Sequence, residues 1–213
     1  MLRESHDITG SLSRFIYESF KGMQEAKGIN QQDVVFLGNG RCYHTLDCFH
    51  SLQKLTPNNP PTLVTDLIES ESFDKLVKKE DKIKRLFVLD PFLCKKQSVF
   101  GSVWRNFLKF ALIPIQFIKF RKILKCFPNP VIHAQSTYYI FLARFSGVPY
   151  VATPQGSELL VRPFSSKAYK LFAGIAYSRA GCITVDSPAM QKALKELYGY
   201  NAIIMKRGVD VAA

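Results

Sequence analysis

Short hydrophobic runs alternate with longer amphipathic segments along the whole chain. The short runs are rich in β-branched residues and bounded by Gly, Pro, Asn or Asp, which predicts buried strands. The longer segments place apolar residues three and four positions apart, which predicts helices. The predicted strands are 33–37, 62–66, 85–89, 131–134, 149–153, 182–185 and 202–205. The predicted helices are 12–26, 46–55, 75–84, 104–127 with an interruption at Pro114, 138–145, about 166–179, and 188–198.

The order of these elements predicts the fold class. Strand and helix alternate, and the strands are continuous apolar runs, which is typical of strands buried on both faces. We therefore expect an α/β fold: a doubly wound, mostly parallel sheet with helices on both faces. Ligands of such sheets bind beyond the carboxyl ends of the strands. The residues at those ends are Gly38–Arg41, Asp90, Ala134–Thr137, Pro154–Glu158, Asp186–Ser187 and Arg207–Asp210.

Charge is distributed unevenly along the 213 residues. The formal net charge is +12, and residues 91–157 contain nine Lys and Arg but no Asp or Glu. Such a basic block suits nucleic acid, anionic lipid or an acidic substrate, or it is simply a solvated surface. The aromatic residues of the block lie among aliphatic ones, as in a core, and no nucleic-acid-binding module is evident. Nucleic acid is therefore not an expected partner.

The segment 104–127 has the pattern of a helix at a membrane interface. After Pro114, one side carries apolar residues and the other carries cations, and Trp104 precedes them as an aromatic anchor. The cations are Lys119, Arg121, Lys122 and Lys125. The pattern predicts peripheral contact with an anionic membrane surface. The alternative is that the apolar side packs on the sheet and the cations are merely solvated, and the two are compatible.

Other features bear on location and metal content. No apolar run approaches the roughly 20 residues of a membrane-spanning helix, and no secretory signal is evident at the N-terminus. The five cysteines are scattered and never spaced CxxC. We expect a reduced, cytoplasmic chain, peripheral at the inner face of the plasma membrane, without a zinc site.

Four segments in the second half resemble a known family. They read VIHAQS at 131–136, PYVATPQGSELL at 149–160, AGCITVDS at 180–187 and IIMKRGVD at 203–210. In this order and spacing they resemble the N-terminal domain of family 4 glycosyltransferases, which have the two-domain GT-B fold. The resemblance implies a retaining transferase that moves a sugar from a nucleotide sugar to a glycan or lipid-linked acceptor in polysaccharide or cell-envelope biosynthesis. It implies no cofactor and no metal.

The resemblance also suggests the domain organisation. Residues 1–213 look like one Rossmann-like acceptor-side domain, because the family's donor-binding domain begins just after Gly208-Val209-Asp210. The family's first strand should precede Thr9-Gly10-Ser11, but Met1–Ile8 is short and polar. We expect a chain without the donor domain and first strand, and therefore without activity on its own. The alternatives are another Rossmann-like enzyme, an epimerase or methyltransferase, and a non-catalytic module that binds membrane or protein.

The resemblance implies roles for individual residues. His133 would contact the acceptor or handle a proton near the site of transfer; the alternative is a buried histidine bonded to a loop carbonyl. The acceptor-binding residues would be Gln135, Gln155, Gly156, Ser157 and Glu158. For Glu158, the alternatives are a helix-capping box or an ion pair with Arg162.

Two further groups complete the predicted site. Gly10 and Ser11 would lie at a helix start and hold a phosphate of the donor or acceptor. The expected interdomain residues are Asp186, Ser187, Arg207, Gly208 and Asp210.

Overall fold

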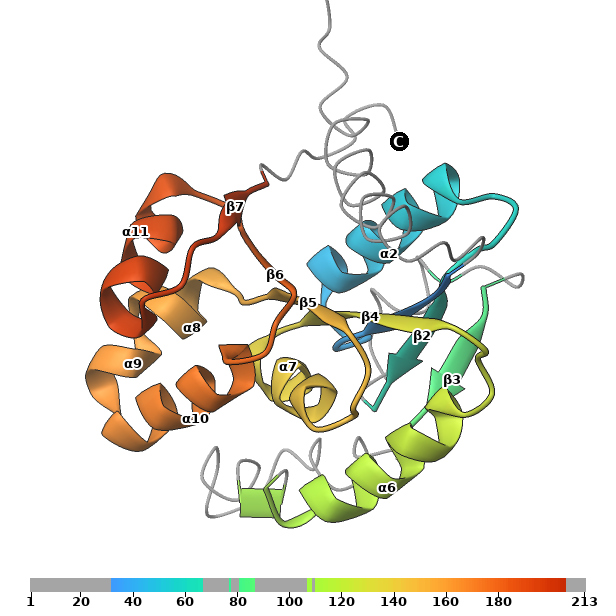
Figure 1. Ribbon diagram of the computed structural model, residues 1–213, viewed down its shortest axis with the longest axis horizontal. Coiled ribbons are helices and arrows are strands. Elements are labelled where there is room, and N and C mark those ends of the chain that lie inside the picture. The colour runs from blue at the N-terminus through green and yellow to red at the C-terminus, as the bar shows by residue number, and fades with distance from the viewer. Residues whose placement is uncertain (1–31, 67–76, 78–80, 87–106, 109, 206–213) are drawn as a thin grey trace, which may run out of the picture.

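In the part of the chain that the structure describes, seven parallel strands form one sheet at the centre of the molecule (Figure 1). The computed structural model describes residues 32–66, 77, 81–86, 107–108 and 110–205. The strands are β1 (Asp33–Leu37), β2 (Thr62–Thr65), β3 (Ile83–Arg85), β4 (Pro130–Gln135), β5 (Tyr150–Thr153), β6 (Cys182–Val185) and β7 (Ile203–Ile204). Their order is β3-β2-β1-β4-β5-β6-β7, so chain progression reverses between β1 and β4. A ligand crevice is expected at the carboxyl ends of these two strands.

Helices cover both faces of the sheet. They are α2 (Tyr43–Leu55), α6 (Ile113–Leu124), α7 (Thr137–Arg144), α8 (Gly156–Leu160), α9 (Arg162–Ser165), α10 (Lys167–Tyr177) and α11 (Pro188–Tyr198). Helix α2 lies on one face, while α6, α7 and α10 lie on the other (Figure 1). Each face has its own buried cluster: Phe36 packs with Phe49 of α2, and Ile132 belongs with Phe120 of α6 and Ile140 of α7 to the second. The predicted doubly wound α/β fold is confirmed.

Local sequence signals fix several helix ends as predicted. The Ser187 hydroxyl accepts a hydrogen bond from the Met190 amide at 3.3 Å and caps α11. Pro188 occupies the first position, and Gly199 ends the helix with φ at 76°. The Ser166 hydroxyl caps α10 in the same way. These caps satisfy backbone groups that a helix end leaves unpaired, so a few residues decide each boundary.

The helix predicted for 75–84 is wrong at its end. Ile83–Arg85 form edge strand β3, and the Leu63 amide donates to the Lys82 carbonyl at 2.8 Å. Charged side chains are common on edge strands because they discourage pairing with other chains. In the sequence, the same charged residues also fit the pattern of a solvent-exposed helix, which explains the wrong prediction. The rest of the predicted strand 85–89 beyond Leu86, and the predicted helix 12–26, lie outside the described residues.

The interruption predicted at Pro114 is confirmed, whereas the segment after β5 differs from expectation. Residues 107–108 and 110–111 are helical, Leu112 lies in a turn, and α6 begins at Ile113 with Pro114 in its first turn, where the missing N–H costs nothing. Helices α8 and α9 follow β5 where no helix was predicted. Both are very short, and helices of four or five residues carry too little periodicity to be recognised from the sequence.

Because of Tyr150, the free energy of unfolding should decrease as the pH rises into the alkaline range. Its hydroxyl donates to the Ala176 carbonyl at 2.6 Å, and burial raises the pKa of Tyr150 to about 12. Between pH about 10 and about 12, the unfolded chain releases a proton that the folded chain retains, so the free energy of unfolding decreases with rising pH. Urea denaturation across this range should give a shallower decrease for Tyr150→Phe. Burial also raises the pKa of Tyr198 to about 12, so part of the decrease should remain. An unchanged slope in Tyr150→Phe would contradict this assignment.

Candidate functional site

The loop after β1 lies close against the ends of β2 and β4. The Gly38 amide donates to the Val64 carbonyl at 3.2 Å, and the Gly40 amide donates to the Thr65 hydroxyl at 2.8 Å. A Cβ atom added at Gly38 would lie 2.6 Å from the Thr45 methyl group and 3.7 Å from Cβ of Gln135. The missing side chain therefore lets this loop approach β4, and Gln135 is buried beneath it.

The loop after β5 places polar side chains at the same edge. Gln155 is half-buried just before α8, and its amide nitrogen lies 3.7 Å from the Cys42 sulfur at the start of α2. This contact spans the carboxyl ends of β1 and β5. Gly156 is half-buried and Ser157 is exposed. Gln155 and Ser157 thus present an amide and a hydroxyl beside the switch point, where a ligand with hydroxyl groups can exchange hydrogen bonds with them.

Glu158 connects two turns of the site. Its carboxylate is buried, and one oxygen accepts from the Ser136 hydroxyl at 2.7 Å. The other oxygen accepts from the backbone amides of Thr137 at 2.9 Å and Gln155 at 3.0 Å. Because these donors lie after β4 and β5, the carboxylate holds the starts of α7 and α8 together.

Both structural alternatives for Glu158 are therefore present. The bond from the Gln155 amide is half of a capping box, and the Glu158 amide in turn donates to the Gln155 carbonyl at 2.9 Å. The exposed Arg162 guanidinium lies 3.9 Å from the same carboxylate. Direct acceptor contact by Glu158 stays a prediction, and its buried, hydrogen-bonded carboxylate favours a positioning role.

Ser136 has a backbone conformation that the sequence did not predict. Its φ of 74° and ψ of 140° lie in a region that residues other than glycine rarely occupy. Such a conformation costs about 1–3 kcal/mol and persists where its surroundings enforce it. The hydrogen bonds of the Ser136 hydroxyl and the adjacent Thr137 amide to Glu158 supply that constraint. The turn after β4 is thus fixed at the edge where a ligand is expected.

Two tyrosines also hold the first turn of α7. The Tyr169 hydroxyl donates to the Thr137 hydroxyl at 2.9 Å, and Tyr177 lies within 2.9 Å of the same oxygen. Burial, reinforced by the Glu158 charge, raises the pKa of both tyrosines well above the ordinary value. Both phenols therefore stay protonated and keep their hydrogen bonds at physiological pH.

The His133 side chain is covered by its neighbours and does not open onto the edge of the sheet. It is only 1% exposed, and its Nε2 lies 2.8 Å from the Thr153 hydroxyl, which lies 2.6 Å from the Thr184 hydroxyl. Its ring centroid is 4.7 Å from that of Phe36. The His133 side chain therefore belongs to a polar row across β4, β5 and β6. The alternative of a buried histidine fits, with a threonine hydroxyl in place of the loop carbonyl; a catalytic role stays a prediction.

A second buried carboxylate lies at the end of β2. Asp66 is 1% exposed and accepts hydrogen bonds from the Gln116 side-chain amide at 3.0 Å and from the Tyr139 hydroxyl. The Tyr138 hydroxyl donates to Gln116. This network joins β2 to α6 and α7 close to the edge. The sequence signal was an Asp at the end of a predicted strand, but its partners lie 50 and 73 residues away.

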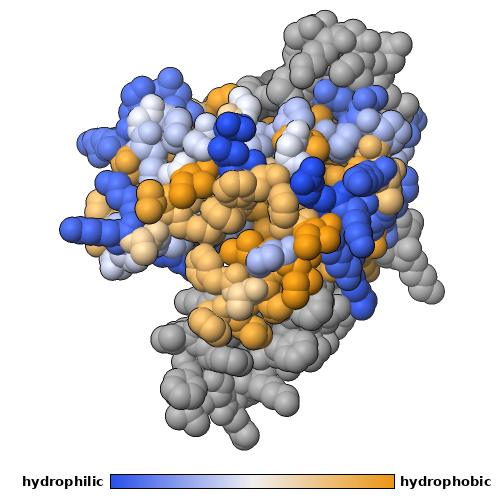
Figure 2. Space-filling view, turned by 60° about the horizontal axis from the view of Figure 1, so that its bottom comes forward, coloured by the Kyte–Doolittle hydropathy of each residue, from blue (hydrophilic) through white to orange (hydrophobic). Residues whose placement is uncertain are grey.

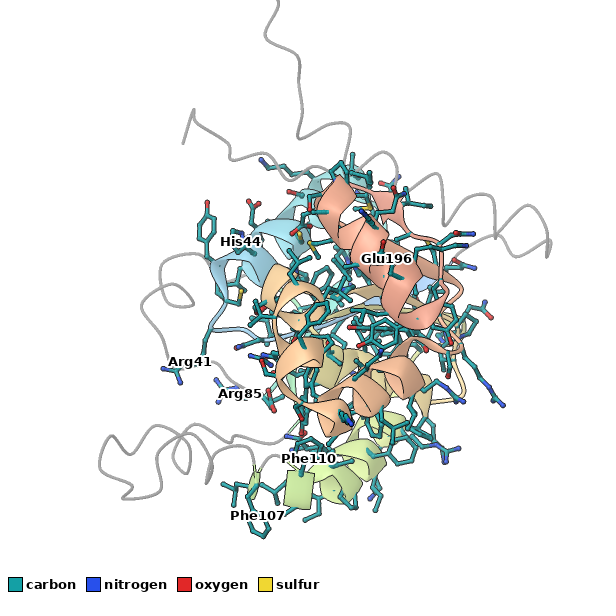
Figure 3. The ribbon with its side chains drawn as sticks, turned by 90° about the vertical axis from the view of Figure 1, so that its left-hand side faces the viewer. Arg41, His44, Arg85, Phe107, Phe110 and Glu196 are labelled. Carbon is teal, nitrogen blue, oxygen red and sulfur yellow. The ribbon has the colours of Figure 1, made fainter. Side chains whose placement is uncertain are left out.

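Cations lie at the other end of the same edge. Arg41 follows β1 and Arg85 ends β3, and both are exposed. Figure 3 shows them with His44 on one side of the molecule, away from α11. Exposed guanidinium groups suit phosphate oxygens, which they bind in a bidentate manner. The edge therefore combines neutral hydrogen-bonding groups with cations.

The remaining predicted site residues divide into two groups. Asp186 and Ser187 are half-buried at the end of β6, next to α11, and their interdomain role stays a prediction. Gly10, Ser11, Trp104, Arg207, Gly208 and Asp210 lie outside the described residues. Among the residues that the structure describes, no group of three His, Cys, Asp or Glu side chains could hold a metal ion.

Comparison with known families identifies the chain. The family model described as Glycosyltransferase Family 4 matches residues 89–213, more than half of the sequence. The chain belongs to glycosyltransferase family 4. The matched region contains β4 to β7, and strands β1 to β3, which precede it in the chain, belong to the same sheet.

Two further findings complete the comparison. Among curated proteins, none matches this family 4 chain. No helix in the described parts of the chain is both long enough and apolar enough to cross a membrane.

Proposed function

We propose that this family 4 domain forms the acceptor side of a retaining glycosyltransferase. The acceptor is a glycan or lipid-linked sugar of polysaccharide or cell-envelope biosynthesis, and the donor is a nucleotide sugar. The observation that carries the proposal is the carboxyl edge between β1, β4 and β5, where the Gln155 amide lies 3.7 Å from Cys42, Ser157 is exposed, and Gly38 lets the loop after β1 approach β4. Family membership supports the reaction class.

The proposed reaction exchanges one bond for another at the anomeric carbon. An acceptor hydroxyl oxygen forms a bond to that carbon, and the bond from the carbon to the diphosphate oxygen breaks. The nucleoside diphosphate leaves with the bonding electrons, and the hydroxyl proton passes to the departing diphosphate. The new glycosidic bond keeps the anomeric configuration of the donor. Donor contacts come mainly from a second domain, as the family resemblance implies.

The residues of the edge have distinct parts in this proposal. Gln155 and Ser157 hydrogen-bond acceptor hydroxyls, and Arg41 and Arg85 attract phosphate of the acceptor or donor. Glu158 fixes the turns that carry these groups, because it binds the donors of both. Rigid placement matters because the reacting atoms must approach within about 3–3.5 Å in the correct orientation.

Sugar transfer by the full-length gene product tests the proposal. The protein is incubated with nucleotide sugars and with membrane extracts or defined lipid-linked acceptors, and both nucleoside diphosphate release and the product anomer are measured. We expect acceptor-dependent release with retained configuration. Gln155→Ala should lower kcat/KM about fivefold, since a hydrogen bond to substrate contributes about 1 kcal/mol. The control is Ser165→Ala, an exposed serine of α9, which should keep full activity.

Other outcomes would contradict the proposal. Conversion of the nucleotide sugar without transfer to any acceptor would favour an epimerase. Failure of the full-length product to bind any sugar nucleotide would favour a non-catalytic module. Equal kcat/KM in Gln155→Ala and wild type would reject the acceptor assignment at the β5–α8 turn.

A further inference from the structure

Hydrophobic side chains gather on one outer face of the molecule, formed by α6, α7 and α10 and their adjoining turns (Figure 2). We refer to the following set of residues as the apolar face: Phe107, Phe110, Ile115, Ile118, Phe145, Leu171 and Ile175. The exposed fractions of these seven side chains range from 38% to 68%. A surface of this kind usually marks an interaction site, whereas single exposed apolar residues do not.

Ring contacts make the apolar face continuous across three helices. The Phe110 ring lies 5.3 Å from the Phe172 ring of α10. Phe172 stacks on Phe141 of α7 at 4.3 Å, and Phe141 lies 4.9 Å from Phe145. Segments more than 30 residues apart in sequence therefore join in one aromatic surface. From the hydrophobic periodicity of the sequence, only the segment 104–127 was predicted to contact a membrane.

The charged residues of α6, α7 and α10 are all positive. Helix α6 carries three basic residues, α7 one and α10 two, six in all, and none of the three helices contains Asp or Glu. They are Lys119, Arg121, Lys122, Arg144, Lys167 and Lys170. The outward side of α6 is apolar in its first half, at Ile115 and Ile118, and cationic from Lys119 onward.

We propose that the apolar face docks onto an anionic lipid bilayer. Exposed aromatic and aliphatic side chains would enter the boundary between headgroups and acyl chains, and the flanking cations would contact the anionic headgroups. This assignment uses all three helices, in contrast to an interfacial role for the single segment 104–127. A protein partner fits the apolar face less well than a bilayer does, because its own interface would need a rim of acidic residues to match the six cations.

The orientation of the docked molecule relates the apolar face to the proposed acceptor site. Figure 3 shows Phe107 and Phe110 at the lower end of the side on which Arg41 and Arg85 project. A bilayer under the apolar face would thus lie beside the carboxyl edge, within reach of a lipid-linked acceptor. This last point rests on the proposed function, whereas docking itself does not.

Vesicle sedimentation of the full chain tests the docking. Vesicles of phosphatidylcholine alone are compared with vesicles containing phosphatidylglycerol, at low and high salt and without any sugar nucleotide. We expect binding to the anionic vesicles that weakens with salt. Lys119→Gln, Lys122→Gln and Lys125→Gln together should weaken it about a hundredfold at low salt, because each cation near such a surface contributes about a fivefold change.

The apolar contribution needs its own variant and a matched control. Ile118→Gln combined with Leu171→Gln should lower binding at least tenfold at both salt concentrations, since burial of apolar surface is not screened by ions. Both side chains are exposed, so the fold should be unchanged. The control is Phe164→Gln, an equally exposed aromatic residue on α9, outside the apolar face, which should bind as wild type does.

Three outcomes would overturn the proposal. If the wild-type protein does not sediment with anionic vesicles at low salt, the apolar face does not dock onto lipid. An equal loss in Phe164→Gln would show non-specific adhesion. A dimer in sedimentation velocity that the Ile118→Gln, Leu171→Gln variant dissociates, with no vesicle binding, would assign the face to a second copy. If vesicle binding persists but the full-length product transfers no sugar, the proposed function fails and the docking stands.

Discussion

Replacing Glu158 by alanine should lower the free energy of unfolding by about 3 kcal/mol. The carboxylate is buried and accepts hydrogen bonds from the Ser136 hydroxyl and the amides of Thr137 and Gln155. Alanine would leave these donors without an acceptor, and each buried donor left in this way costs about 1–3 kcal/mol. Some of them can reach water after local rearrangement, which keeps the total near the lower end of the sum. Urea denaturation followed by circular dichroism measures the change.

Two further substitutions sharpen the Glu158 experiment. Glu158→Gln keeps one acceptor oxygen but turns an N–H₂ group toward a donor, so an intermediate loss is expected. Glu196→Ala is the matched control: that carboxylate is exposed on α11 (Figure 3), and its partner Lys192 is 3.8 Å away. Exposed pairs of this kind contribute about 0–1 kcal/mol. Equal effects of Glu158→Ala and Glu196→Ala would refute the connecting role of Glu158.

The second large effect is expected in α6. Phe120→Ala should cost about 3–5 kcal/mol, because the side chain is fully buried in the cluster that contains Leu124 and Tyr139, and alanine would leave a cavity there. Thermal and urea denaturation would both show the loss.

The matched control for Phe120 lies two residues away. Ile118 is 58% exposed on the same helix, and Ile118→Ala should change stability by less than about 0.5 kcal/mol. The pair separates the two sides of α6, because Phe120 holds the helix on the sheet and Ile118 belongs to the apolar face. Similar losses in both variants would show that the helix packs differently.

Much of the fold could be predicted from the sequence because its signals are local. Continuous β-branched runs are stable only where both faces of a strand are covered, so they indicated the parallel sheet and its strands. Ser187, Pro188 and Gly199 fixed α11 to the residue, because capping depends on groups within one helical turn. β3 was partly misread, because Lys84 and Arg85 suit an exposed helix as well as an edge strand.

The edge of the sheet that carries the candidate site could be predicted from the sequence, but the burial of its side chains could not. The rule for parallel sheets located the carboxyl edge and therefore Gln155 and Ser157. The same rule could not show that the His133 side chain is covered by its neighbours, since burial depends on Phe36 and Thr153 in adjacent strands.

The sequence by itself determined the fold class, the family and the edge of the sheet where a ligand is expected, since each follows from short segments of the chain. Only the tertiary structure decided the role of Glu158, whose partner Ser136 is 22 residues away, and the network of Asp66, whose partner Tyr139 is 73 residues away. It also decided the apolar face, which exists only because α6, α7 and α10 lie together on one side of the sheet (Figure 1). Hydrophobic periodicity records which side of a helix is covered, but which exposed sides adjoin depends on how the helices pack.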